Sequence, residues 1–193
     1  MCSDSDVFKD QFEGHDNKQN IPCHITVIDK NEIILTSKTE NKDILLAMIK
    51  KEITSAETIE RVNNPFIIKI YDYFETRNNI YIVSEGSSDG TLRIKLDNTR
   101  LTQVECLEII FQIVLGVSSL ATASIIHRDI TPMNILSCGN LYKLRDGGLS
   151  KKAEDAFQTV KGNYLYMAPE YFTGVPNTNA VDVWSIGIIA YEI

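Results

Sequence analysis

The chain has 193 residues, a formal net charge of −7 and 44% hydrophobic residues. This length can bury a sizeable core, and the acidic balance argues against nucleic acid as a partner held by charge. No apolar run approaches the roughly 18 residues of a membrane span, so no membrane association is expected. Because the chain shows no secretory leader, we expect reduced thiols and a cytoplasmic location. The cysteines are too widely spaced to form a metal knuckle, and they are Cys2, Cys23, Cys106 and Cys138.

The N-terminal part predicts a tail followed by strands. Residues 1–20 are polar and acidic, and we expect them to be disordered. Short β-rich runs follow at 25–28, 33–36 and 44–49, separated by polar turns. A short helix is expected at about 55–61.

A long amphipathic helix is predicted over 103–122. Its apolar residues recur at three-to-four spacing, which predicts that they face the core, and they are Leu107, Ile110, Phe111, Val114, Leu115, Val117 and Leu120. Further on, residues 135–136 and 141–144 predict a hairpin around a turn at 139–140. That hairpin would bring Asn134 and Asp146, which flank it, to one edge.

The run from His127 to Leu136 is His-Arg-Asp-Ile-Thr-Pro-Met-Asn-Ile-Leu, and Ala-Pro-Glu and Asp-Val-Trp follow at 168–170 and 182–184. These segments resemble the catalytic loop and later motifs of eukaryotic protein kinases, of the serine/threonine type because of Pro132. The resemblance covers about 25–193. It implies an α+β, two-lobed protein-kinase-like fold, with a β-rich small lobe at 21–85 and a mainly helical large lobe at 86–193 lacking its last helices.

The same resemblance implies transfer of the ATP γ-phosphate to serine or threonine hydroxyls of a protein substrate. Asp129 would orient the acceptor hydroxyl. Asn134 and Asp146 would hold Mg²⁺, a hard cation that takes amide and carboxylate oxygens. Thr131 is the third catalytic-loop residue assigned to the site, where serine/threonine kinases have a lysine.

Runs at 64–74 and 79–85 are similar to the next two strands of the small lobe and the hinge between lobes. By that alignment Ser84 lies at the back of the nucleotide pocket. Glu85, Gly86 and Ser87 would offer backbone groups to adenine, and Leu136 is included among the residues that contact the nucleotide.

The lysine that contacts the nucleotide phosphates has two candidates, Lys50 and Lys51. Lys50 fits an Ala-Met-Ile-Lys alignment, Lys51 shares a strand face with Ala47 and Ile49, and a third alignment leaves both lysines as solvated surface residues. No glycine-rich loop precedes them, which predicts a weaker grip on phosphate. The helix glutamate that pairs with this lysine would fall at Ser55. A one-turn adjustment could bring Glu57 to that position, because residues three or four apart share a helix face, but Glu57 is expected to be a solvated acid.

Other positions depart from the kinase pattern. Asn163 replaces the threonine that meets the catalytic-loop lysine, and Gly147 replaces the phenylalanine after the metal-binding aspartate. Ser150 and Thr159 lie in the counterpart of the activation loop and are candidate phosphorylation sites.

These departures leave a second interpretation open, a catalytically impaired pseudokinase that binds nucleotide or docks a partner. The chain ends inside the apolar run 186–191, so a protein partner is expected to cover the truncated C-terminal helix. A third interpretation is an incomplete product that never folds stably.

Overall fold

The computed structural model describes residues 9–15, 22–31, 54, 57–145, 151–152, 163–173 and 178–193. The chain divides into two compact units, the first of Met1–Arg61 with Lys69–Gly86 and the second of Val62–Ile68 with Ser87–Ile193. The first unit is a β-sheet and the second is mainly helical, which confirms the predicted α+β class.

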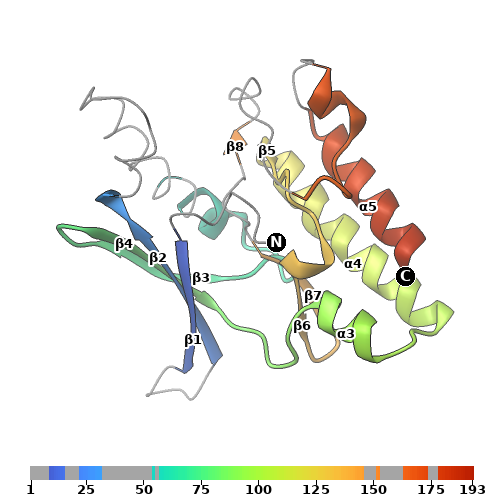
Figure 1. Cartoon of the computed structure of the whole chain (residues 1–193), viewed down its shortest axis with the longest axis horizontal. Helices are drawn as coiled ribbons and strands as arrows, with labels where there is room; N and C mark the ends of the chain where they lie inside the picture. The colour runs from blue at the N-terminus through green and yellow to red at the C-terminus, as the bar shows by residue number, and fades with distance from the viewer. Residues whose placement is uncertain are drawn as a thin grey trace. The chain divides into compact units, whose positions relative to one another are not determined.

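The first unit is built on an antiparallel sheet in the order β1-β2-β4-β3 (Figure 1). Its strands are β1 (Lys9–His15), β2 (Pro22–Asp29), β3 (Ile70–Glu75) and β4 (Asn79–Glu85). Ile28 of β2 lies opposite Ile80 of β4, and both side chains are buried with Ile82 packed against them. Because β-branched side chains pack well on a pleated surface, these pairs anchor the two central strands.

The disordered tail predicted for residues 1–20 is wrong for Lys9–His15, which form β1. The strand pairs with β2 in a register from Lys9 opposite Ile28 to His15 opposite Pro22. Strand pairing uses backbone groups, so a polar segment can add an edge strand without a hydrophobic signal. The predicted strands at 25–28 and 79–85 are confirmed, whereas those at 33–36 and 44–49 lie outside the described residues.

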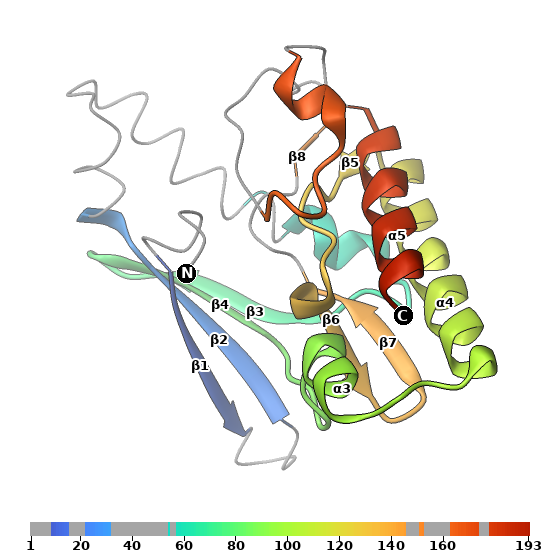
Figure 2. The ribbon, with the colours of Figure 1, turned by 45° about the vertical axis from the view of Figure 1, so that its right-hand side comes forward.

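The second unit contains helices α3 (Leu92–Asn98), α4 (Gln103–Thr122) and α5 (Ala180–Glu192) and the hairpin of β6 (Ile135–Cys138) and β7 (Leu141–Leu144). Helices α4 and α5 lie side by side (Figure 2). Short elements complete it: β5 (Ile125–Ile126), η2 (Pro132–Asn134), β8 (Lys151–Lys152) and η4 (Pro169–Phe172). The predicted hairpin is confirmed, with Ile135 opposite Leu144.

Helix α4 has the predicted bounds because a capping box fixes its start. The Thr102 hydroxyl accepts a hydrogen bond from Glu105 N, and the Glu105 carboxylate accepts one from Thr102 N at 2.8 Å. In the middle of the helix, a Cβ on Gly116 would lie 3.0 Å from Phe66 O. This close approach and the Leu144 N to Phe66 O hydrogen bond of 2.8 Å pack Phe66 within the second unit, to which Val62–Ile68 belongs.

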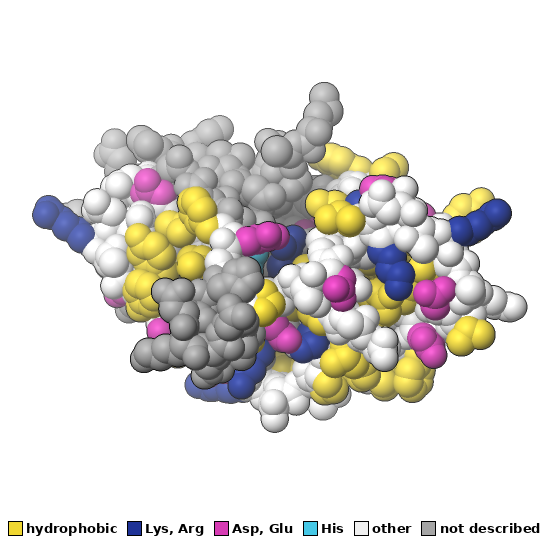
Figure 3. Space-filling view, turned by 90° about the horizontal axis from the view of Figure 1, so that it is seen from below, with side chains coloured by type: hydrophobic (Ala, Val, Ile, Leu, Met, Phe, Trp, Pro, Cys, Tyr) yellow, Lys and Arg dark blue, Asp and Glu magenta, His cyan; other side chains and the backbone are white. Residues whose placement is uncertain are grey.

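The buried face of α4 differs in part from the predicted one. The helix buries Ile109, Ile113, Gly116, Val117 and Leu120, whereas three predicted core residues, Leu107, Phe111 and Val114, are exposed. Apolar residues occupy more than one face of α4, so spacing alone could not select the buried one. Figure 3 shows hydrophobic side chains in separate patches broken by charged ones.

Among the described residues, α4 is also the helix with the length and hydropathy that would permit a membrane span. One such helix is weak evidence for a membrane span, because the core helix of a soluble protein can have the same length and hydropathy.

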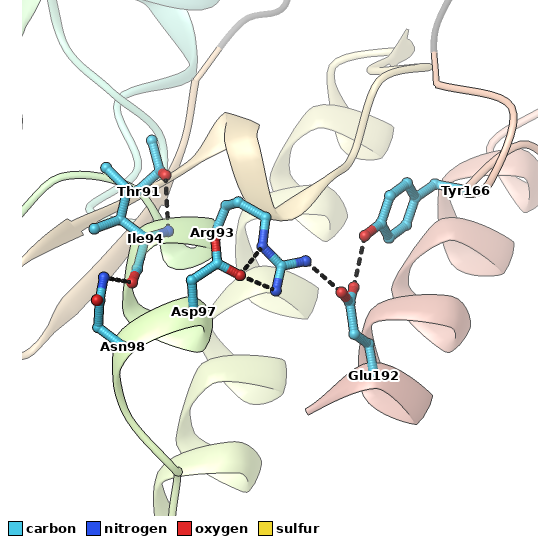
Figure 4. Close-up of polar contacts among 7 residues, drawn as sticks. All are labelled: Thr91, Arg93, Ile94, Asp97, Asn98, Tyr166 and Glu192. Atoms are coloured by element: carbon cyan, nitrogen blue, oxygen red, sulfur yellow. Dashed lines mark hydrogen bonds and ion pairs between the residues drawn. The ribbon is translucent and has the colours of Figure 1, made fainter. Parts of the chain in front are cut away.

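A polar network joins α3 to the end of α5 (Figure 4). Arg93 is ion-paired with Glu192, and its guanidinium also contacts Asp97 Oδ1 at 2.9 Å. The hydroxyl of Tyr166 donates to Glu192 Oε2 at 2.6 Å. The last turn of α5 is therefore tied both to α3 and to the segment that leads into η4.

Replacing Tyr166 by Phe should change the pH dependence of stability. Burial and the hydrogen bond to Glu192 raise the pKa of Tyr166 from 10.0 to about 12. The fold therefore favours the neutral phenol, and its stabilising contribution is complete below pH 10 and is lost as the pH rises towards 12. Urea unfolding across this range should show a steeper loss of stability in the wild type than in Tyr166→Phe.

The matched control is Tyr191→Phe, which alters an exposed tyrosine on α5, the helix that carries Glu192. Its unfolding curves should follow the wild type at every pH. Parallel curves for the wild type and Tyr166→Phe would contradict the assigned role of the Tyr166–Glu192 bond.

Candidate active site

The predicted catalytic residues lie between β5 and β6, in a loop held by buried neighbours. Ile126, Ile130 and Ile135 are fully buried, so the backbone on both sides of the polar side chains is packed into the second unit. The short helix η2 begins with a proline at its first position, a residue whose fixed φ suits a helical start. The loop is thus a rigid support rather than a free surface turn.

Asp182, in the first turn of α5, fixes the start of this loop. Its two carboxylate oxygens accept hydrogen bonds from His127 N and Arg128 N, each at 2.8 Å. Arg128 has φ of 69°, a left-handed conformation that costs energy for a residue other than glycine. Burial raises the pKa of Asp182, and the neighbouring His127 and the two N–H donors oppose that rise.

The imidazole of His127 connects the loop to the end of the hairpin. Its Nδ1 lies 3.3 Å from Asp129 N, an N–H donor, and its Nε2 lies 2.9 Å from Arg145 O. Because Nδ1 must accept, the proton is on Nε2, which donates to the carbonyl of Arg145. This buried ring therefore sets the spacing between Asp129 and Arg145.

Asp129 and Asn134 are in direct contact. Asn134 Nδ2 donates to Asp129 Oδ2 at 2.7 Å and to Asp129 O at 2.9 Å. With its amide nitrogen directed at Asp129, Asn134 presents Oδ1 to the other side. There, Arg145 Nη2 lies 3.4 Å from Asn134 Oδ1 and 3.3 Å from Met133 O.

The described residues contribute one oxygen ligand suited to Mg²⁺, Asn134 Oδ1, beside the carboxylate of Asp129. Within the described part of the chain, no three His, Cys, Asp or Glu side chains form a cluster able to hold a metal. The second predicted ligand, Asp146, lies outside the described residues. Asn134 Oδ1 is one oxygen of the kind that magnesium takes, and Arg145 Nη2 lies 3.4 Å from it.

Thr131 is buried and acts through its backbone in the described contacts. Its carbonyl accepts a hydrogen bond from Asn134 N at 2.9 Å, which closes the turn of η2. Its side chain makes no cap to that turn. Leu136 is also buried, on β6 opposite Lys143.

Among the other predicted nucleotide-binding residues, Ser87 uses its hydroxyl for hydrogen bonds within the second unit. Its hydroxyl lies 2.7 Å from Gly90 O and 2.6 Å from Ser137 O, and Asp89 N donates to it. In the first unit, Glu85 N donates to Lys69 O at 2.8 Å.

Several predicted residues lie outside the described part of the chain. They are Lys50, Lys51, Asp146, Gly147, Ser150 and Thr159. By contrast, Glu57 is described, and it is not simply a solvated acid. Tyr73 Oη donates to Glu57 Oε1 at 3.4 Å, and desolvation and this carboxylate raise the pKa of Tyr73.

Two residues of the site received no role from sequence reasoning. Asp182 was noted only within its motif, although an acidic residue among apolar ones in the first turn of a helix is a signal for a buried acceptor. Arg145 directly precedes the predicted metal ligand Asp146 in the sequence. Its contact with Asn134 depends on the geometry of the β6–β7 hairpin, and the spacing of residues in the sequence does not indicate it.

Comparison with known proteins gives one family. The chain matches the protein kinase domain over residues 25–193. It is 34% identical over 179 residues to the serine/threonine-protein kinase polo of Drosophila melanogaster, which covers 89% of this chain and 31% of polo. It is 31% identical over 185 residues to the CBL-interacting serine/threonine-protein kinase 21 of Arabidopsis thaliana, covering 93% of this chain and 42% of that relative.

An Aurora kinase of Candida glabrata is 31% identical over 180 residues, a match that covers 91% of this chain and 48% of the relative. The chain therefore spans less than half the length of each of these three relatives.

Replacing Asp182 should destabilise the second unit strongly. Asp182→Ala leaves two buried N–H groups without their acceptor, and each such group costs about 1–3 kcal/mol. Asp182→Asn keeps one acceptor oxygen, so its loss should be smaller. Urea denaturation followed by circular dichroism measures both.

Asp97→Asn is the control, because Asp97 is an exposed acid on α3 whose ion pair with Arg93 spans one helical turn, and such i,i+4 pairs contribute about 0.3–0.5 kcal/mol. If Asp182→Ala and Asp97→Asn had equal effects, Asp182 would not be the support of the loop.

Proposed function

Because the chain belongs to the protein kinase family, we propose that it transfers the γ-phosphate of ATP to serine or threonine hydroxyls of protein substrates. The observation that carries this proposal is the 2.7 Å hydrogen bond between Asn134 Nδ2 and Asp129 Oδ2. It holds a carboxylate and an amide oxygen in one loop, and these are the groups that phosphoryl transfer needs for an acceptor hydroxyl and a metal ion.

Asp129 would act on the acceptor. Its carboxylate is oriented by Asn134, and its backbone N–H is directed at His127 Nδ1, so the side chain has little freedom to turn. A carboxylate in this setting can accept a hydrogen bond from a serine or threonine hydroxyl and take its proton as the bond to phosphorus forms. Asp129 is thus the proposed catalytic base or orienting group.

Asn134 Oδ1 and, from the sequence, Asp146 are the proposed magnesium ligands. When bound, Mg²⁺ would neutralise the negative charge on the phosphates. The N–H of Asn134 is donated to Thr131 O and its carbonyl accepts from Arg145 N at 2.8 Å, so both of its backbone groups are fixed before any metal arrives. This arrangement supports Asn134 as a preorganised ligand.

The remaining nucleotide contacts are proposed from the family resemblance. Backbone groups of Glu85 and Ser87 would meet adenine, Leu136 would contact the base, and Lys50 or Lys51 would meet the phosphates. A cytoplasmic location belongs to the same proposal.

One observation favours the second candidate, a pseudokinase with little phosphotransfer. Thr131 is a buried hydroxyl residue at the position where serine/threonine kinases have a lysine beside the transferred phosphate. A missing positive charge at such a site can cost several kcal/mol of transition-state stabilisation. Such a protein would keep the loop for nucleotide binding or partner docking.

A phosphotransfer assay decides between the two candidates. The purified chain is incubated with Mg²⁺, γ-labelled ATP and generic protein substrates, and label in phosphoserine and phosphothreonine is measured. Asp129→Asn should lower the rate by roughly 100-fold or more, because a positioned base contributes about that factor.

The matched control is Asp97→Asn, which makes the same chemical change on the exposed side of α3 and should retain wild-type activity. Equal rates for the wild type and Asp129→Asn would contradict the proposed catalytic role and favour the pseudokinase.

A further inference from the structure

We propose that Met133 determines substrate specificity, and that the substrates of this chain carry an apolar side chain within about three positions of the acceptor serine or threonine. This inference rests on the proposed function, because it names the substrate class of that site. The observation that carries it is which side chains the catalytic loop brings to the surface.

The catalytic loop presents two side chains to a substrate. Of residues 125–137, all are buried except Asp129, which is partly exposed, and Met133, which is 50% exposed. Both neighbours of Met133 in the chain, Pro132 and Asn134, are buried. The exposure of Met133 is therefore specific to that side chain and does not come from a loosely packed turn.

The backbone around Met133 is held in place beside Asp129. Asn134 N donates to Thr131 O at 2.9 Å, which closes the turn that contains Met133. The carbonyl of Met133 accepts from Arg145 Nη2 at 3.3 Å. Asn134, the next residue in the chain, donates through Nδ2 to Asp129 Oδ2 at 2.7 Å. Met133 thus lies next to the residue that touches the proposed acceptor-binding carboxylate.

The short path between the two exposed side chains limits how a substrate can bind. An extended peptide advances about 3.3 Å per residue. A peptide that brings its hydroxyl to Asp129 therefore has side chains within two or three positions that can cover Met133. Single exposed apolar side chains are common on protein surfaces, and the position beside Asp129 is what gives this one a role.

The chemistry of methionine selects an apolar contact. Its side chain is uncharged, unbranched and polarizable, so it adapts its shape to an aliphatic or aromatic group. Such a contact removes apolar area of both partners from water, which is favourable. A lysine or arginine of the substrate would find no opposite charge on Met133. We therefore expect leucine, methionine or phenylalanine near the acceptor to be preferred to basic residues.

Binding of fluorescein-labelled serine peptides, followed by fluorescence anisotropy, tests this proposal without nucleotide. Three peptide sets carry leucine, alanine or arginine at the three positions on each side of a central serine. The wild-type chain should bind the leucine set roughly fivefold more tightly than the alanine set, somewhat less than one methylene contributes in a closed pocket. The arginine set should bind no better than the alanine set.

Met133→Glu should reverse this ranking. A carboxylate at this exposed position repays arginine with an ion pair, so the arginine set should bind up to about fivefold more tightly than the leucine set. Val104→Glu is the matched control, because it makes a similar change at a 64% exposed apolar residue of α4 and should keep the wild-type ranking. If Met133→Glu does not melt cooperatively, Met133→Lys should instead favour a glutamate peptide set.

Three results would overturn the proposal. They are equal binding of the leucine and alanine sets by the wild type, an unchanged ranking in the folded Met133 variant, and no binding of any set at millimolar peptide. Phosphotransfer to the same peptides is measured separately. A leucine preference without transfer would refute the proposed function and retain Met133 as a docking residue, whereas transfer without a preference would retain the function and refute this inference.

Discussion

The carboxylate of Asp182 is the interaction on which the site depends. It accepts the N–H groups of His127 and Arg128 at 2.8 Å and so joins the first turn of α5 to the loop that carries Asp129 and Asn134. A buried carboxylate and a left-handed arginine are both unfavourable alone, and the two hydrogen bonds stabilise them together. An apolar helix and a polar loop thereby become one rigid unit.

From this support the polar contacts follow in order along the loop. His127 accepts a hydrogen bond from Asp129 N and donates one to Arg145 O. These two bonds hold the loop against the end of the hairpin. Asn134 then bridges Asp129 and Arg145, because its Nδ2 donates to the Asp129 carboxylate and its Oδ1 faces the Arg145 guanidinium. Each member is fixed by the one before it, so the proposed acceptor-binding and metal-binding groups share a single scaffold.

Helices and strands could be predicted from the sequence where residues close together in the chain determine the structure. Helix α4 has its predicted bounds because Thr102 and Glu105 form a capping box, and the β6–β7 hairpin follows from a turn at Gly139. The strand Lys9–His15 was missed because backbone pairing supplies no hydrophobic pattern. Asp129 and Asn134, which lie five residues apart in the predicted catalytic loop, are hydrogen-bonded, whereas the Arg145 contact arises from tertiary geometry that spacing does not encode.

Thermal unfolding with and without magnesium-ATP tests the central claim, that the loop belongs to a working nucleotide site, most directly. A ligand that binds only the folded protein stabilises it by about 2.7 kcal/mol at a hundredfold excess over its dissociation constant. We expect a magnesium-dependent rise in the melting temperature that is absent in Asp146→Asn. A cooperative melt that magnesium-ATP leaves unchanged would contradict it.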